Sequence, residues 1–135
     1  MEANQELIFK LSMFEQQIQQ INQQVQAVEE GIIELRSLKN GLGEIKNSNG
    51  KEIMASIGKG IFIKAKIISD ELNVDIGEKN FVKKSVSETQ EIIESQIRKL
   101  EGVRIELDEN LETLGNEAKK IIEEAEKENS KRFKN

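Results

Sequence analysis

The sequence contains no cysteine, histidine, proline, tryptophan or tyrosine, and these absences exclude several classes of function. Without cysteine and histidine, the chain has no thiol nucleophile, disulfide, thiolate metal site or imidazole for acid–base catalysis. We therefore expect no enzymatic activity, no catalytic residue, no metal site and no cofactor. The lack of cysteine also fits an intracellular protein, and we expect a cytoplasmic one.

Long hydrophobic runs are missing as well. No stretch approaches the roughly 20 apolar residues that cross a bilayer, and the N-terminus lacks a signal-peptide pattern, so we expect no membrane association. The 135 residues are 36% hydrophobic and 33% charged, which is too little apolar material for a large globular core. The net charge of −5 argues against nucleic acid as the primary partner, because phosphate binding needs clustered lysine and arginine.

What the chain does have is a heptad repeat in its first third. The apolar residues recur at alternating steps of four and three, which keeps one narrow stripe facing a partner helix. Lys39 breaks the stripe and Leu42 resumes it. The seam residues before the break are Leu7, Leu11, Phe14, Ile18, Ile21, Val25, Val28, Ile32 and Leu35.

A second heptad seam occupies the last third of the chain. It follows Ser85 and Glu88, whose spacing is typical of a capping box at a helix start. Arg104 stands at a seam position as an exception. The apolar residues of this seam are Ile93, Ile97, Leu100, Leu107, Leu111, Leu114, Ala118, Ile121 and Ala125.

Between the two seams the apolar period changes to two, which predicts β-strands. Residues 53–57 and 61–67 alternate around the turn Gly58-Lys59-Gly60, and residues 72–76 and 81–82 flank a second turn at Gly77. The glycine-containing turn lacks the spacing of a phosphate-binding loop. We therefore predict two consecutive β-hairpins.

These elements predict one domain over residues 1–135. Its parts are a helix over 1–46, two β-hairpins over 52–84, a helix over 85–130 and a tail over 131–135. Each helix would be about 60 Å long, and the two would fold back as an antiparallel pair with Leu7 near Ile121 and Ala125. The predicted fold class is mostly α with a small β insert: a long antiparallel coiled-coil helical hairpin, with two β-hairpins at the end away from the termini.

The predicted β-hairpins have more apolar side chains than two thin hairpins can cover, and they leave open strand edges. We therefore predict that the chain oligomerises through this region. The residues assigned to oligomerisation are Ile53, Ile57, Ile61, Ile63, Ile67, Val74, Ile76 and Val82.

The order helix–hairpin–hairpin–helix resembles the alpha class of prefoldin subunits, in the archaeal form. The similarity is sharpest in residues 52–66, EIMASIGKGIFIKAK, and continues in residues 74–77, VDIG, and 81–84, FVKK. The resemblance implies an ATP-independent chaperone subunit in a hexamer of two alpha and four beta subunits. It also implies capture of unfolded proteins at coiled-coil tips and their transfer to a group II chaperonin.

Candidate client-binding residues lie at both ends of the chain, which the antiparallel pairing would bring together. For Ile8, Phe9 and Met13 we favour client contact, since a two-helix seam cannot cover every side of a helix. For Leu7, Leu11 and Ile121, a role as the end of the coiled-coil core is the simpler alternative. The full candidate set is Leu7, Ile8, Phe9, Leu11, Met13, Phe14, Ile121, Ile122, Ala125 and Phe133.

A structural or adaptor coiled coil that bridges two fixed partners is the main alternative. It would explain the heptads equally well, but it does not explain two β-hairpins with incomplete apolar faces.

Overall fold

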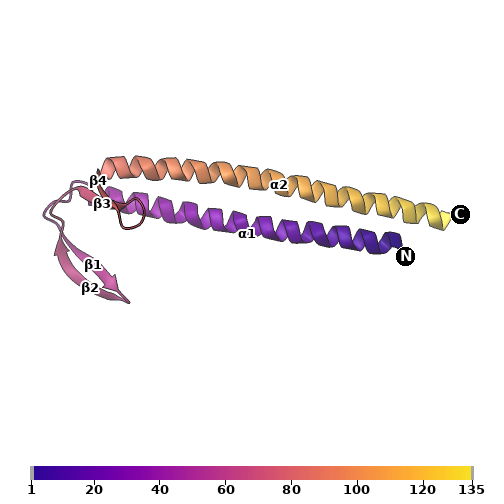
Figure 1. Cartoon of the computed structure of the whole chain (residues 1–135), viewed down its shortest axis with the longest axis horizontal. Helices are drawn as coiled ribbons and strands as arrows, with labels where there is room; N and C mark the ends of the chain where they lie inside the picture. Colours follow the sequence, from indigo (N-terminus) through magenta and orange to yellow (C-terminus); the bar gives the residue numbers. More distant parts are fainter. Residues whose placement is uncertain (1, 135) are drawn as a thin grey trace. The chain divides into compact units, whose positions relative to one another are not determined.

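The chain folds as two long helices with two β-hairpins between them in sequence. The computed structural model describes the backbone of residues 2–134 and the side chains of residues 4–131. The order of elements confirms the predicted fold class, mostly α with a small β insert. The elements are α1 (Glu2–Ile45), β1 (Glu52–Gly58), β2 (Ile61–Lys66), β3 (Glu71–Asp75), β4 (Phe81–Ser85) and α2 (Val86–Lys134) (Figure 1).

The chain divides into two compact units. The first, the helical unit, comprises Met1–Ile32 and Lys99–Asn135. The second, the hairpin unit, comprises Ile33–Arg98. Each of the two helices therefore contributes one part to each unit.

In the helical unit, the N-terminal part of α1 lies beside the C-terminal part of α2 and runs in the opposite direction (indigo and yellow in Figure 1). Each predicted seam residue of α1 from Leu7 to Val28 is half-buried, and so is each one of α2 from Leu107 to Ala125. Among the described side chains of this unit, Ile32 alone is buried. The burial pattern confirms the heptad seams, and it shows that a two-helix pair covers them only in part.

Arg104 remains partly exposed at its seam position, where it contacts α1. Its Nη2 lies 2.8 Å from Oε1 of Glu29, and its Nε lies 4.0 Å from Oδ2 of Asp108 one turn further along α2. The seam tolerates this cation because an acidic residue of the opposite helix compensates its charge.

The hairpin unit holds most of the buried core. Leu42 of α1 and Val86, Ile93 and Ile97 of α2 are all buried there. These four side chains continue the two heptad seams into the part of each helix nearest the strands in sequence. The burial of apolar side chains is therefore most complete in the hairpin unit.

Lys39, the predicted break in the first seam, is paired across the helices. Its Nζ donates a hydrogen bond to Oε2 of Glu94 at 2.5 Å, and Nε2 of Gln90 donates to its backbone carbonyl at 3.2 Å. The hydrogen bond and positive charge of Lys39 lower the pKa of Glu94 below its ordinary value of 4.5, with smaller contributions from Arg98 and Arg36. A charged pair thus replaces one apolar layer of the seam.

Local hydrogen bonds define the helix boundaries next to the strands. After α1, Asn47 adopts a left-handed conformation with φ of 60°, and the buried Ser48 hydroxyl donates to the carbonyl of Glu44 at 2.9 Å. At the start of α2, the Ser85 hydroxyl accepts a hydrogen bond from the amide of Glu88 at 3.0 Å. This contact is the serine half of the predicted capping box.

The predicted tail over 131–135 is wrong, because α2 continues to Lys134. No glycine or proline follows Gly115, so nothing in the sequence interrupts the helix. Lys131 also favours a helix C-terminus, since its positive charge complements the negative end of the helix dipole.

The first hairpin, β1–β2, has one apolar face and one mixed face. Ile53 pairs with Ala65 and Ala55 with Ile63, so these four side chains share a face. A register shift between Ser56 and Gly58 marks a bulge at Ile57. Lys59 and Gly60 form the turn, and their φ values of 49° and 78° are those of a type I′ turn.

The second hairpin, β3–β4, is shorter and leads directly into α2. Val74 pairs with Val82, and Glu71 pairs with Ser85, the residue that also caps α2. At the turn, the amide of Gly77 donates to Oδ1 of Asp75 at 2.8 Å. This Asx turn and the glycine, with φ of 132°, reverse the chain.

Truncation of a seam residue in the hairpin unit should destabilise the chain strongly. Ile97 is 2% exposed, so Ile97→Ala should lower the free energy of unfolding by about 2–4 kcal/mol. Ile105 is 60% exposed on the same helix, and Ile105→Ala should change it by less than about 0.5 kcal/mol. Urea titration followed by circular dichroism measures both values. Equal losses in the two variants would contradict the seam assignment.

The pair of Lys39 and Glu94 should make stability depend on pH. Because the pKa of Glu94 is lowered in the folded chain, the pair contributes stability above the ordinary pKa of 4.5, which is lost as the pH falls through the lowered value. The free energy of unfolding should therefore decrease more below pH 4.5 in the wild type than in Glu94→Gln. The difference between the two decreases should be small, because the Glu94 side chain is 40% exposed and water screens the pair. Urea titrations at several pH values measure this dependence. If the free energy of unfolding falls equally with pH in the wild type and in Glu94→Gln, the pair does not contribute to the pH dependence.

Candidate functional site

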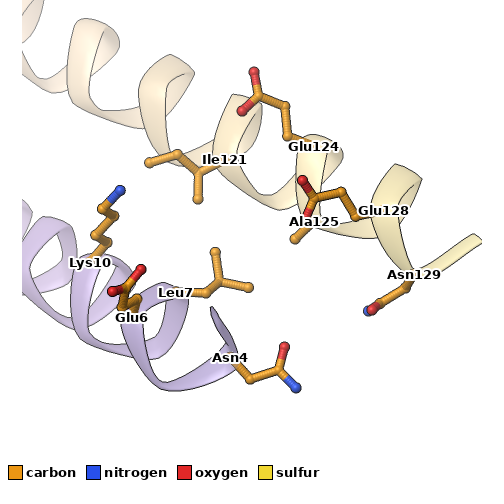
Figure 2. A pocket seen from close by; sticks show the side chains of 9 residues that line it. All are labelled: Asn4, Glu6, Leu7, Lys10, Ile121, Glu124, Ala125, Glu128 and Asn129. Atoms are coloured by element: carbon orange, nitrogen blue, oxygen red, sulfur yellow. The ribbon is translucent and has the colours of Figure 1, made fainter. Parts of the chain in front are cut away.

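The ends of the two helices meet in the helical unit, where the candidate site lies. Leu7 of α1 and Ile121 and Ala125 of α2 point toward one another (Figure 2), as the antiparallel register predicted. Around them is a shallow depression of about 200 Å³. Its lining residues are Asn4, Glu6, Leu7, Lys10, Ile121, Glu124, Ala125, Glu128 and Asn129.

The seam residues at this end are covered on one side only. Leu7, Leu11 and Phe14 of α1 are half-buried, as are Ile121 and Ala125 of α2. Each is therefore covered in part and remains accessible in part. These five candidates therefore combine a structural role in the seam with accessible apolar surface.

The candidates outside the seam are exposed. Ile8 is 67% and Phe9 66% exposed, and Met13 and Ile122 are also largely accessible. Their helical positions point away from the seam, so neither helix can cover them. Contiguous exposed apolar side chains of this kind mark interaction surfaces. The side chain of Phe133, the remaining candidate, lies outside the described residues.

A second depression connects the seam with these exposed residues. Its apolar lining includes Phe14 and Ile121 from the seam and Met13 from the exposed set, with Lys10 and Gln17 at its edge. A bound apolar side chain in this depression would contact both sets at once. We name the candidate residues in positions 7–14 and 121–125 the tip surface.

Charged side chains surround the apolar floor of the tip surface. Glu6 and Lys10 come from α1, and Glu124 and Glu128 from α2 (Figure 2). These residues keep the helix ends hydrated, while the second depression, whose surface is mainly apolar, imposes no fixed hydrogen-bond geometry on a ligand. The arrangement suits apolar side chains of varied sequence better than one defined small molecule.

The predicted oligomerisation residues fall into two groups. Ile67, Val74 and Val82 are half-buried, and Val74 and Val82 pair with each other across β3–β4. The others are exposed and lie mostly on the first hairpin. They are Ile53, Ile57, Ile61, Ile63 and Ile76.

Several exposed apolar residues were missed at the level of sequence. Those on the helices lie off the heptad seams. Their only signal in the sequence was an aliphatic residue at a position where the seam predicts a polar one. On the helices these are Ile33, Leu38, Ile92, Val103 and Ile105, and in the hairpins and their connection Met54, Phe62, Ile68 and Phe81.

The described residues contain neither a metal-binding cluster nor a membrane-spanning helix. Within that part of the chain, no cluster of three or more acidic, cysteine or histidine side chains is placed to bind a metal ion. Neither of the described helices combines the length and hydrophobicity needed to span a bilayer. The tip surface and the exposed face of β1–β2 are therefore the main candidates.

Comparison with known proteins connects this architecture to one family. The family model described as "Prefoldin subunit" matches residues 14–131. The prefoldin subunit alpha of Methanobrevibacter smithii is 33% identical over 71% of this chain, and that of Methanosphaera stadtmanae is 24% identical over 67% of it. In both cases the matched region spans 66% of the relative's own length.

The fold is also similar to that of a solved structure. A filamentous PFD from Methanocaldococcus jannaschii, determined by cryo-EM, superposes with a TM-score of 0.74 at 22% sequence identity. The superposition covers 84% of this chain and 96% of that one. At this identity the match supports the fold alone.

Proposed function

The chain belongs to the prefoldin family of chaperone subunits, and from this premise we propose that it holds unfolded polypeptides at its tip surface without ATP. The observation that carries the proposal is the exposure of Ile8, Phe9 and Met13 beside the half-buried seam. An unfolded client presents apolar side chains in no fixed geometry. A surface with an apolar floor and no required hydrogen bonds can accept them in many arrangements.

The energetics of the tip surface favour weak, repeated contacts. Fully burying one large apolar side chain contributes about 1.5–3 kcal/mol, and the partial burial possible here contributes less. One copy should therefore bind a client only weakly. Several copies that share a client raise the overall affinity through effective concentration. Met13 suits changing clients, because its unbranched side chain adapts its shape.

Such sharing requires an assembly, which we assign to the β-hairpins. The apolar face of β1–β2 carries Ile53, Ile61 and Ile63, all exposed in the single chain. Its strand edges are open as well, since each sheet has only two strands. Closing the hairpins of several subunits into barrels would cover both the face and the edges. We propose a hexamer of two such chains with four beta-type subunits.

The remaining parts of the proposal follow from the family resemblance. The assembled subunits would work in the cytoplasm and transfer clients to a group II chaperonin. The tip surface supports this role, because bound polypeptide would stay accessible to a second chaperone. Nucleic acid and membranes are not proposed as partners.

Removing the exposed part of the tip surface should reduce chaperone activity. The triple variant Ile8→Ser, Phe9→Ser and Met13→Ser keeps Leu7, Leu11 and the rest of the seam. It should therefore assemble normally but suppress aggregation of a chemically denatured client much less than the wild type. Light scattering after dilution of the client from denaturant measures the effect.

The matched control is the triple variant Ile92→Ser, Val103→Ser and Ile105→Ser, which removes three exposed aliphatic side chains of α2 outside the tip surface. It should retain wild-type activity. A chain without residues 1–14 and 119–135 should lose the activity. Full activity in this truncated chain, or equal loss in both triple variants, would remove the tip surface from the mechanism.

Charges on the apolar face of the first hairpin should prevent assembly. Ile53→Asp with Ile63→Asp places two carboxylates where the proposed barrel is closed to water, and burying an unpaired charge is costly. Light scattering coupled to size exclusion, after co-expression with a beta-type subunit, should show the hexamer with the wild type but not with this variant. Glu71→Lys with Lys83→Glu, on the exposed face of β3–β4, is the control. A hexamer that contains the doubly charged variant would refute assembly through this face.

The same preparation separates the proposal from an adaptor coiled coil. A chaperone subunit should form a defined assembly that protects several unrelated clients. An adaptor should bind one partner and protect none.

A further inference from the structure

A shallow, open groove lies on α1 in the hairpin unit, next to the seam residue Leu42. Ile33 is 66% and Leu38 52% exposed, and with Ile45 they form its apolar walls. Gly41 forms the floor, where an added Cβ would meet nothing within 4 Å. The space above Gly41 is therefore open, and a bulky side chain of a partner could lie over it.

A line of acidic residues, here named the glutamate rim, runs along α1 through the groove, and Glu34 is the member that lines the groove itself. Glu30, Glu34, Ser37, Gly41 and Glu44 follow one another at steps of four and three, so they lie along one line of the helix. Three of these five positions are glutamates, and all three glutamates are exposed. The chemistry that fits is an apolar or aromatic side chain flanked by positive charge.

The mixed face of the first hairpin has this chemistry. Phe62, Lys64 and Lys66 alternate along β2 and share a face, with Met54 paired to Lys64 and Ser56 to Phe62. Phe62 and Met54 are both exposed. Residues 51–67 contain four lysines and one glutamate, a net charge of +3. This face is not used by the proposed barrel, which closes on the opposite, apolar face.

We propose that the mixed face of β1–β2 from a second copy of this chain docks into the α1 groove, with Phe62 over Gly41 and its lysines against the glutamate rim. The inference rests on the proposed assembly through the hairpins. The spacing allows it: Phe62 and Lys64 are about 6.6 Å apart along a strand, and Gly41 and Glu34 about 10.5 Å along the helix. A lysine side chain is long enough to bridge the difference between these two spacings.

Chemical cross-linking between two single-cysteine chains tests the contact, because the wild type has no cysteine. Ser37→Cys places a thiol in the groove of one chain, and Ser56→Cys places one beside Phe62 in the other. After the two are co-assembled with a beta-type subunit, a short bis-maleimide should link them. Ser12→Cys, on an exposed serine of α1 far from the groove, replaces Ser37→Cys in the control and should give only background.

Filling the groove should abolish the cross-link without unfolding the chain. Gly41→Leu occupies the space over the floor, and leucine also has a higher helix propensity than glycine. Gly115→Leu, at another helical glycine with open space around it, should leave the cross-link unchanged. Lys64→Glu in the chain that carries Ser56→Cys should lower the yield of the cross-link about two- to fivefold. Glu34→Lys in the chain that carries Ser37→Cys should restore that yield.

The outcomes separate this inference from the proposed function. A normal hexamer without the Ser37–Ser56 cross-link, or with a cross-link insensitive to Gly41→Leu, overturns the groove contact and leaves the chaperone proposal intact. The groove contact is also overturned if a beta-type subunit or a client, and not a second copy of this chain, protects the Ser37→Cys thiol from maleimide. Failure of any assembly overturns both.

Discussion

A pair of helices can cover only one strip of each, and this geometric limit determines which surfaces of the chain stay available. The seam residues of the helical unit reach half-burial, and the described residues of that unit contain a single buried side chain, Ile32. Every apolar residue off the strip stays in contact with water at a free-energy cost. The tip surface and the α1 groove are both consequences of this limit.

Charge pairs complement the apolar seam by restricting how the helices align. A repeating seam alone would tolerate a slip by one heptad, since successive layers are chemically alike. Glu29 pairs with Arg104, and Lys39 pairs with Glu94. The partners are ten residues apart on each helix, so both bridges require the same register. A slip by one heptad would separate Arg104 from Glu29 and Lys39 from Glu94. The register that these pairs select also places Leu7 opposite Ile121 and Ala125.

Sequence periodicity predicted the elements that depend on local pattern. The heptads identified both seams and the register at Leu7, and the period of two identified both β-hairpins. The end of α2 was missed because helix termination depends on the absence of breakers as well as on the apolar pattern, and the pattern stops before Lys134. The α1 groove was missed because Leu38 and Ile33 look like ordinary helix residues. Only the folded chain shows that nothing covers them. The partner residues of Arg104 and Lys39 required the antiparallel register before they could be found.

The junction between β4 and α2 contains no connecting loop. Ser85 pairs with Glu71 in the sheet, and its hydroxyl caps the helix that begins at the next residue. Between α1 and β1, by contrast, residues 46–51 intervene, with Asn47 and Gly50 in left-handed conformations. Tension applied along α2 would reach the strand ladder directly, whereas the same load on α1 would first act on the hydrogen bonds of its connector, such as that from the amide of Lys51 to the carbonyl of Ser48. The two helices are therefore mechanically unequal, and α2 is the one that is coupled without a connector to its neighbouring strand.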